Sequence, residues 1–293
     1  MEVSFLIVTK NRPTELDLTL QKLKALVDLK IHEVLVYIDG CVATEALIAK
    51  YPWVIWDSST KSLGASPARN FLYKKASGSV FIGLDDDAHP LSNDFIVAVE
   101  REYLDNKKLG IIAFQEVRGI FDTDEKALEN ANFNQNSHLT NDFVGCGFAI
   151  SKEAYFSTRG FPTWIDIYGE ESCLAIEVLE NNYDILYQPK IIVNHRVDVQ
   201  KRLLAGRNYF RFEKQLKNTF KYYLAYYQNP TFKIAKMLHH NFMKYGLQDF
   251  RYFRLFFKSV FSVLIGLPKL PAYRKPISKA TFLKMKKLKG LHY

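Results

Sequence analysis

Residues 79–87, SVFIGLDDD, join a continuous apolar run directly to three consecutive aspartates. An apolar run this short is typical of a strand that is buried on both faces, as in a parallel sheet. Carboxylates this close together raise one another's pKa unless a cation neutralises them. Because alternate side chains of an extended chain point the same way, we expect Asp85 and Asp87 on one side and Asp86 on the other.

Short apolar strands alternate with helical segments on both sides of this stretch. Strands are predicted at residues 3–9, 33–38, 53–56, 79–84, 109–117, 144–151 and 185–194, and helices at 14–24, 43–50, 65–75 and 169–181. This alternation predicts an α/β fold with a largely parallel sheet, in which ligands bind at the carboxyl ends of the strands. Residues 10–12, Asp39 and residues 85–87 all lie at such ends, so we expect one shared site. The polar, Asn-rich stretch 121–141 is expected to be a mobile loop.

The Asp-x-Asp pair at the end of the strand suits a hard divalent cation. Mg²⁺ and Mn²⁺ prefer oxygen ligands and often combine one or two carboxylates with phosphates of the substrate. The sequence therefore predicts Mn²⁺ or Mg²⁺ on Asp85 and Asp87, bridging the protein to a diphosphate. For this cluster taken alone, a solvated acidic turn with a helix-capping aspartate is the alternative.

The charge of the chain divides near residue 200. Residues 1–199 contain 19 basic and 29 acidic side chains, whereas residues 200–293 contain 21 basic and 2 acidic ones. The net charges are therefore −10 and +19, which together give the +9 of the whole chain. Such asymmetry predicts an α/β domain over 1–199 and a separate basic, helical region over 200–293.

One segment of the basic region has the pattern of an interfacial helix. Residues 250–267 place Arg251, Arg254 and Lys258 at helical spacing, opposite a wide apolar surface. A basic and aromatic amphipathic helix predicts attachment to an anionic membrane surface. The alternative is a helix that packs its apolar side on the first domain and leaves its charged side in water.

The cysteines and the apolar runs bear on the location of the protein. Cys41, Cys146 and Cys173 lack the paired spacing of a zinc site or a disulfide framework, which favours a reducing compartment. We recognise neither a signal peptide nor an uncharged apolar run long enough to cross a bilayer. We therefore expect a cytoplasmic protein that is peripheral on the inner face of the cell membrane.

Five segments, in order, resemble glycosyltransferase family 2, whose members have the Rossmann-like GT-A fold. They are FLIVTKNR at 5–12, VLVYIDG at 34–40, LGASPARN at 63–70, the acidic strand end at 81–87, and residues 147–195 with YGEESCL at 168–174 and Asn194-His195. Each motif alone is weak, but five in the family's order, at predicted strand ends, form a strong combined signal. The resemblance implies a GT-A sheet flanked by helices, with the basic helical region added at the C-terminus.

The resemblance implies a nucleotide-sugar donor. The residues implied to bind its nucleotide are Thr9, Asn11, Arg12, Asp39, Gly64, Arg69 and Asp86. Asp39 would accept a hydrogen bond from a pyrimidine N–H. Arg69 would contact the donor phosphates or brace the aspartates. UDP is the expected nucleotide, with dTDP and GDP as alternatives.

The resemblance also implies inversion at the anomeric carbon by a single displacement. Glu171 has the position of the family's general base and Glu170 is the second candidate, although acidic residues also favour the first turn of any helix. Asp85, Asp87 and His195 are implied to bind the metal, and a local hydrogen bond is the alternative for His195. The expected acceptor is a hydroxyl of a glycan or lipid-linked glycan, as in bacterial surface polysaccharide synthesis.

Three other functions stay open. A sugar-nucleotide pyrophosphorylase would have a Gly-rich loop after the first strand, which residues 9–13 lack. A nucleic-acid binder would explain the basic, aromatic tail but not the acidic strand ends, so no nucleic-acid partner is expected. The main alternative is a degenerate GT-A protein that only binds a nucleotide sugar or nucleic acid, since Ile38, Ser62 and Glu171 depart from the family's motifs.

Overall fold

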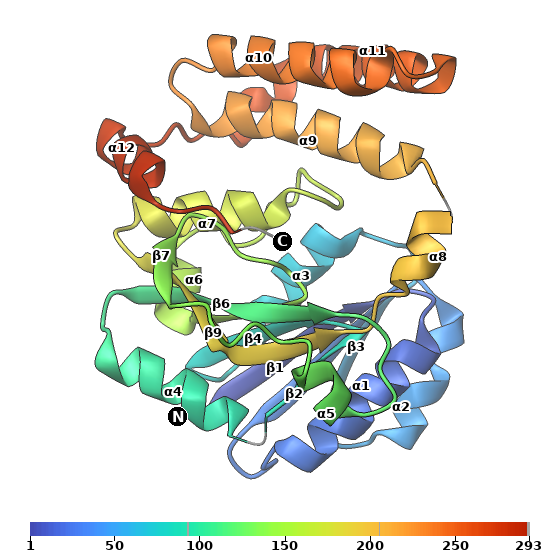
Figure 1. The fold of residues 1–293 in the computed structure, drawn as a ribbon, viewed down its shortest axis with the longest axis vertical. Helices are drawn as coiled ribbons and strands as arrows, with labels where there is room; N and C mark the ends of the chain where they lie inside the picture. The colour runs from blue at the N-terminus through green and yellow to red at the C-terminus, as the bar shows by residue number, and fades with distance from the viewer. Residues whose placement is uncertain (93, 205, 292–293) are drawn as a thin grey trace.

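The computed structural model describes residues 1–92, 94–204 and 206–291, and its centre is a mixed sheet (Figure 1). The strands in these ranges are β1 (Val3–Thr9), β2 (Glu33–Asp39), β3 (Ile55–Ser59), β4 (Val80–Asp85), β5 (Ala88–Pro90), β6 (Leu109–Arg118), β7 (His138–Thr140), β8 (Gly147–Ser151) and β9 (Asp184–His195). Their order is β3-β2-β1-β4-β8-β6-β9-β5, and β7 pairs with β9.

Most strands of the sheet run in one direction. β1, β2, β3, β4, β6 and β9 are parallel to one another, whereas β5, β7 and β8 are reversed. The register pairs Val8 with Asp85 and Thr9 with Ile38, so the carboxyl ends of β4, β1 and β2 lie side by side. The prediction of a mostly parallel α/β sheet with converging strand ends is confirmed.

Helices cover both faces of the sheet. They are α1 (Pro13–Leu26), α2 (Ala46–Lys50), α3 (Ala65–Tyr73), α4 (Phe95–Asp105), α5 (Asp124–Leu128), α6 (Lys152–Ser157) and α7 (Glu170–Glu180). Phe5 and Ile7 of β1 pack in one core with α1 and α4, while Leu6 packs in a second core with α3 and α7. Burial of alternate side chains on opposite faces explains why the central strands are continuously apolar.

The stretch 121–141 does not form the loop that we expected. Thr123 caps α5 by accepting a hydrogen bond of 3.3 Å from the backbone N–H of Lys126. β7 lies in the same stretch and pairs with β9 at the edge of the sheet. The prediction missed both elements because each is short, and their apolar contacts are with residues distant in sequence. The helices α4 and α6 were also not predicted.

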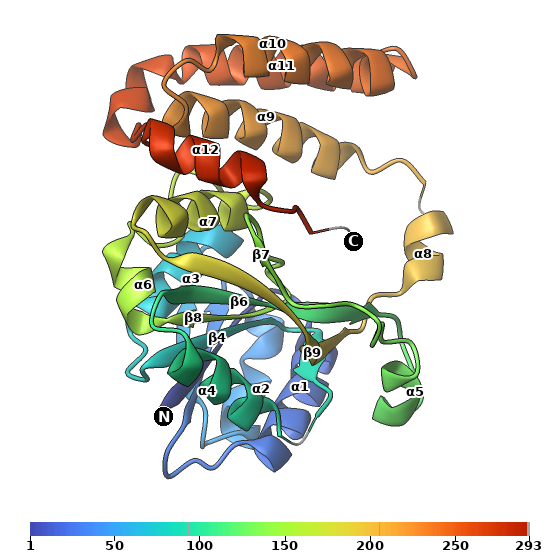
Figure 2. The same ribbon diagram turned by 60° about the vertical axis from the view of Figure 1, so that its left-hand side comes forward.

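The chain after β9 is helical, as the sequence predicts. Its elements are α8 (Val199–Leu204), α9 (Tyr209–Tyr226), α10 (Thr231–Asn241), a π-helical turn (Phe242–Gly246), α11 (Phe250–Ile265), a 3₁₀ segment (Leu267–Ala272) and α12 (Lys279–Lys287). Figures 1 and 2 show α10 and α11 together as an outer layer, with α9 between this layer and α7. Within the described ranges, no helix combines the length and apolarity needed to cross a membrane.

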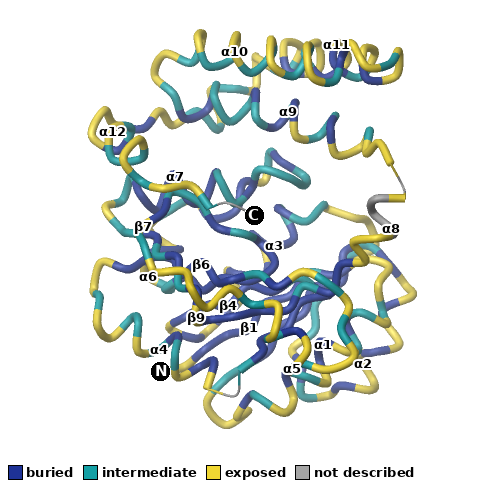
Figure 3. Tube along the Cα trace, viewed as in Figure 1, coloured by how far each residue is buried: buried dark blue, intermediate teal, exposed yellow. Residues whose placement is uncertain are grey.

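One apolar cluster attaches this helical region to the sheet domain, and a second holds its own helices together. Ala225 and Tyr226 of α9 pack with Cys173 and Ile176 of α7. A separate cluster joins α9 to α11, with Phe212 and Leu216 of α9 against Tyr252 and Phe256 of α11. Phe282 and Met285 of α12 pack on the first cluster, so α9 and α12 together fix the C-terminal helices to the sheet domain. Figure 3 shows that much of the outer layer formed by α10 and α11 is exposed.

Candidate active site

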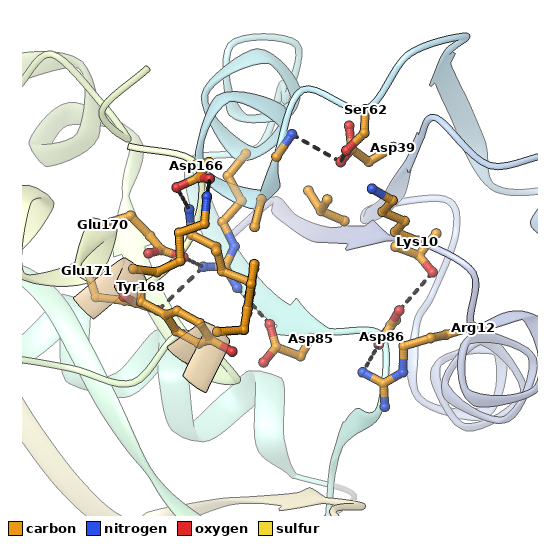
Figure 4. Close-up of a pocket in the computed structure, with 18 residues that line it drawn as sticks. Lys10, Arg12, Asp39, Ser62, Asp85, Asp86, Asp166, Tyr168, Glu170 and Glu171 are labelled. Atoms are coloured by element: carbon orange, nitrogen blue, oxygen red, sulfur yellow. Dashed lines mark hydrogen bonds and ion pairs between the residues drawn. The ribbon is translucent and has the colours of Figure 1, made fainter. Parts of the chain in front are cut away.

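A cleft of about 580 Å³ lies at the carboxyl ends of β1, β2 and β4 (Figure 4). The N-terminal ends of α3, α7 and α9 form its other walls. The predicted site residues that line the cleft are Thr9, Arg12, Asp39, Gly64, Arg69, Asp85, Asp86, Glu170 and Glu171. Of the remaining predicted residues, Asp87 and His195 lie behind this wall, and Asn11 is exposed beside it.

Arg69 links the carboxylates of two different elements. It lies in the second turn of α3, and its Nη2 donates to Asp85 Oδ1 at 2.6 Å. Its Nη1 is 3.2 Å from Glu170 Oε1 and 3.5 Å from Glu171 Oε1. Burial alone would lower the pKa of Arg69, but these carboxylates raise it above its ordinary value. The predicted bracing of the aspartates therefore extends to both glutamates.

Glu170 and Glu171 occupy the first turn of α7. Gly169 precedes them with a φ of 101°, a backbone conformation that favours glycine. Burial raises the pKa of both carboxyl groups, to about 8 for Glu170. Glu170 is only 3% exposed, whereas the side chain of Glu171 is 23% exposed, so Glu171 is the more accessible of the two to a substrate.

Asp86 faces the loop after β1, as the alternation predicts. Its carboxylate accepts a hydrogen bond of 2.8 Å from the hydroxyl of Thr9 and lies 2.8 Å from Arg12 Nη1. Burial raises the pKa of Asp86 to about 7. Arg12 also contacts Asp87 at 2.5 Å, so one half-exposed guanidinium ties the loop after β1 to two aspartates.

Asp87 contacts His195, the last residue of β9. Asp87 Oδ1 is 3.3 Å from His195 Nε2, while His195 Nδ1 lies 2.5 Å from Glu116 Oε1. Burial would lower the pKa of His195, but its contacts with Asp87, Cys146 and Glu116 raise it to about 12. Glu116 was not predicted, because nothing in the sequence of β6 distinguishes it from an ordinary strand residue.

The set Asp85, Asp87 and His195 fits a divalent cation. One ligand atom of each lies within 4.8 Å of the others. Asp87 Oδ1 is buried, and its ion-pair contact with His195 Nε2 at 3.3 Å does not have hydrogen-bond geometry, so both atoms could turn to a shared cation. Two carboxylates and one imidazole suit Mn²⁺ or Mg²⁺, and a cation here would displace the proton of His195. Glu116, Cys146 and His195 also lie within such distances of one another.

Asp39 organises the loop between β3 and α3. It accepts hydrogen bonds from Ser62 Oγ at 2.6 Å, from the N–H of Leu63 at 2.6 Å and from the N–H of Gly64 at 3.1 Å. Gly64 has a φ of 95°. The carboxylate that we predicted to bind the nucleotide base thus already fixes this loop in place.

Several residues of the cleft were not predicted from the sequence. The main ones are Ser62, Asp166, Tyr168, Phe210 and Lys214, whereas Lys10 belongs to the strand-end residues that were expected here. Lys214 of α9 pairs with Asp166, which lies before α7. The C-terminal region therefore contributes to the cleft, and only the tertiary packing of α9 reveals this.

A second cavity of about 360 Å³ adjoins the cleft on the other side of Glu171. Its polar lining residues include Asp142, Ser172, Gln215, Thr219 and Asn241. Tyr168 and Glu171 line both cavities. Burial, with a smaller contribution from the charge of Glu171, raises the pKa of Asp142 to about 7. Glu171 is therefore accessible from two directions.

The sheet topology and the acidic cleft at its strand ends define a chain of the GT-A class. The sequence profile of Glycosyl transferase family 2 matches residues 4–158, more than half of the chain. The chain therefore belongs to this family, and the resemblance found in the sequence is confirmed. An uncharacterized protein of Haemophilus influenzae is 32% identical over 111 residues, which cover 35% of this chain and 58% of that protein.

Solved structures share the fold at low sequence identity. GalNAc-T7 with UDP, GalNAc and Mn²⁺ superposes with a TM-score of 0.62 at 15% identity, covering 80% of this chain and 49% of that one. TarS 1-349 of S. aureus with UDP-GlcNAc gives 0.62 at 14% identity, covering 88% and 79%. The mannosyltransferase PcManGT of Pyrobaculum calidifontis with GDP-Man and Mn²⁺ gives 0.59 at 15%, covering 97% and 83%. The chain thus spans about half of the GalNAc-T7 chain and less than two thirds of the Haemophilus protein.

Proposed function

We propose that this chain is an inverting glycosyltransferase that moves a sugar from a nucleoside diphosphate to a hydroxyl of a glycan or lipid-linked glycan. The observation that carries the proposal is the position of Glu171. This carboxylate is held 3.5 Å from Arg69 in the wall that separates the acidic cleft from the second cavity. A single displacement needs such a group between a donor on one side and an acceptor on the other.

The donor belongs in the larger cleft. Its nucleotide would lie along Thr9, Arg12 and the loop that Asp39 fixes, where side chains and backbone N–H groups from β1 and α3 converge. UDP is the first choice, with dTDP or GDP as alternatives. Solved relatives of this fold carry UDP, UDP-GlcNAc or GDP-Man, which supports a nucleotide-sugar donor.

Asp85, Asp87 and His195 would hold Mn²⁺ or Mg²⁺ against the diphosphate. When bound, such a cation neutralises the charge that develops on the leaving group. Arg69 orients Asp85, since it donates a hydrogen bond to this carboxylate. Arg12 does the same for Asp87 from the opposite side.

Glu171 would act as the general base. A hydroxyl that enters from the second cavity would give its proton to Glu171 while its oxygen attacks the anomeric carbon. The raised pKa of Glu171 suits this task, because a more basic carboxylate accepts a proton more readily. Hydroxyl-rich acceptors match the polar lining that Gln215, Thr219 and Asn241 give to this cavity.

We also propose a separate role for each of the two parts of the chain and a cellular location for the protein. Residues 1–199 would supply the catalytic carboxylates and most of the donor cleft, and residues 200–293 would complete both cavities and bring the protein to an anionic membrane surface on the cytoplasmic side. The net charge of +19 in the second part supports this location. A role in bacterial surface polysaccharide synthesis would follow from a lipid-linked acceptor.

The proposed base is tested by replacing Glu171 with glutamine. Release of nucleoside diphosphate from a panel of UDP-, dTDP- and GDP-sugars with Mn²⁺ reports turnover with water as the acceptor. We expect Glu171→Gln to lower this rate about 100-fold or more while donor affinity is retained. Glu153→Gln, at an exposed position in the first turn of α6, is the matched control and should leave the rate unchanged.

Two results would contradict the proposal. Full activity of Glu171→Gln would remove this residue from the chemistry and transfer the role to Glu170. Donor binding by the wild-type protein without any turnover would instead support the degenerate, binding-only alternative, which the substitutions Ile38 and Ser62 in the family's motifs suggest.

A further inference from the structure

The helix α11 packs on α9 through only one of its faces. The buried residues of α11 are Tyr252, Phe256, Ser259 and Val263. They follow helical spacing, and their partners on α9 include Phe212 and Leu216. The contact with α9 therefore already buries one apolar face of α11.

A second apolar face of α11 is exposed to solvent. It consists of Phe250 (74% exposed), Phe253 (38%), Phe257 (38%), Phe261 (57%), Leu264 (44%) and Ile265 (80%). We call these six residues the α11 aromatic face. Successive members from Phe250 to Leu264 are separated by three or four positions, so they form one stripe along the helix. An exposed apolar stripe of this length is unusual for a surface that faces only water.

Basic side chains accompany the stripe. Arg251, Arg254 and Lys258 lie on the flank of the same helix, and the guanidinium of Arg254 lies 5.9 Å from the ring centroid of Phe250. The region 200–293 contains only two acidic residues, Glu213 and Asp249. Each is already ion-paired, Glu213 with Lys258 at 2.8 Å and Asp249 with Arg207. The surroundings of the α11 aromatic face are therefore strongly positive.

The positive charge around the α11 aromatic face favours an anionic lipid surface over a second copy of the chain as its partner. A second copy of the chain would bring two basic flanks together, and like charges across an interface cost several kcal/mol. An anionic lipid surface instead pairs negative headgroups with the arginines and lysines, while its acyl boundary accepts phenylalanine rings. The stripe spans about 20 Å at a rise of about 1.5 Å per residue, which suits a helix lying in the plane of a bilayer.

We propose that the α11 aromatic face is the membrane-inserting surface of this protein and that its partner is an anionic lipid bilayer. The inference rests on the proposed membrane location but not on the transfer reaction. Phe210 and Lys214, at the N-terminal end of α9, line the active-site cleft, and α9 packs directly on α11. The cleft therefore lies one helix layer from the bilayer, within reach of an acceptor carried on a lipid.

The test is sedimentation of the full chain with vesicles, without any sugar nucleotide. Vesicles of phosphatidylcholine mixed with phosphatidylglycerol are compared with vesicles of phosphatidylcholine alone. The variant F250Q/F261Q/I265Q removes the three most exposed side chains of the stripe, which are 74%, 57% and 80% exposed, so its thermal unfolding should match the wild type. The control L104Q/I120Q/F133Q replaces three side chains that are 72%, 68% and 66% exposed on the sheet domain.

We expect the wild type and the control variant to bind the anionic vesicles and the stripe variant to bind about tenfold or more weakly. Equal binding of the stripe variant would overturn the assignment of this face, while leaving a membrane location in place. Failure of the wild type to bind would overturn both. A wild-type dimer in light scattering that the stripe variant converts to a monomer would show that the occupant is a second copy, which also overturns the proposal.

Discussion

The guanidinium of Arg69 donates a hydrogen bond of 2.6 Å to Asp85 from a position that is only 8% exposed. The same group lies 3.2 Å from Glu170, in a different element. One cation on α3 thus balances the acidic end of β4 and the acidic start of α7. The proposed metal ligands and the proposed base therefore depend on a common residue.

We predict that Arg69→Met strongly destabilises the protein. Removing the cation leaves Asp85 and Glu170 close together without compensation, and breaking a buried ion pair from one side typically costs about 3–5 kcal/mol. Urea denaturation measures the change in the free energy of unfolding. Arg101→Met, at an exposed position on α4, should change it by less than about 0.5 kcal/mol. Equal effects of the two substitutions would show that Arg69 does not hold these carboxylates together.

Gly145 gives a test of Glu171 that leaves the glutamate itself intact. A Cβ at position 145 would overlap Glu171 Oε1 and lie 3.0 Å from Arg69 Nη1, so Gly145→Ala must displace the Glu171 carboxylate from its place beside Arg69. We expect turnover to fall about 10-fold or more while donor affinity changes little, because misplacing a reacting group is costly to the chemical step. Gly290→Ala meets no atom within 4 Å and is the control. A Gly145→Ala enzyme with normal turnover would contradict the assignment of Glu171 as base.

Asp142 should make stability depend on pH. Its pKa is raised to about 7 in the folded protein, from an ordinary value of about 3.9. Between these values the folded state holds a proton that the unfolded state has lost, so this residue's contribution to stability falls as pH rises. The stability gained by Asp142→Asn should therefore grow from about pH 4 to about pH 7 and then stay constant. The melting temperatures of the wild type and Asp142→Asn, measured from pH 4 to pH 7, test this prediction. A stability gain that does not change with pH would contradict the raised pKa of Asp142.

The strand ends of the site were predictable because parallel strands impose a simple geometry. β2, β1 and β4 are neighbours, so Asp39 and Asp85 had to meet the loop after β1. The alternation of side chains separated Asp86 from Asp85, but Asp86 and Asp87 form a turn after β4 and both contact Arg12, which alternation did not predict. These inferences needed only local patterns and the order of the strands.

Contacts between distant elements were not predictable. β8 inserts antiparallel between β4 and β6, and this insertion is invisible in the apolar pattern of either neighbour. The contact of Glu116 with His195 depends on the register of β6 against β9. The pairing of Lys214 with Asp166 depends on how α9 packs. The sequence of residues 250–267 shows a wide apolar surface but not that one part is covered by α9 and another is exposed.

The most direct test of the account is whether a nucleotide sugar binds in a metal-dependent way. Thermal unfolding is measured with UDP-, dTDP- and GDP-sugars, each with Mn²⁺ or with a chelator. We predict that one nucleotide raises the melting temperature only with Mn²⁺, since a ligand of the folded state stabilises it. Asp87→Ala should lose this response. A cooperative unfolding transition of this variant shows that it is still folded. No response of the folded wild-type protein to any nucleotide, or an equal response of Asp87→Ala, would contradict a nucleotide-sugar site built on Asp85, Asp87 and His195.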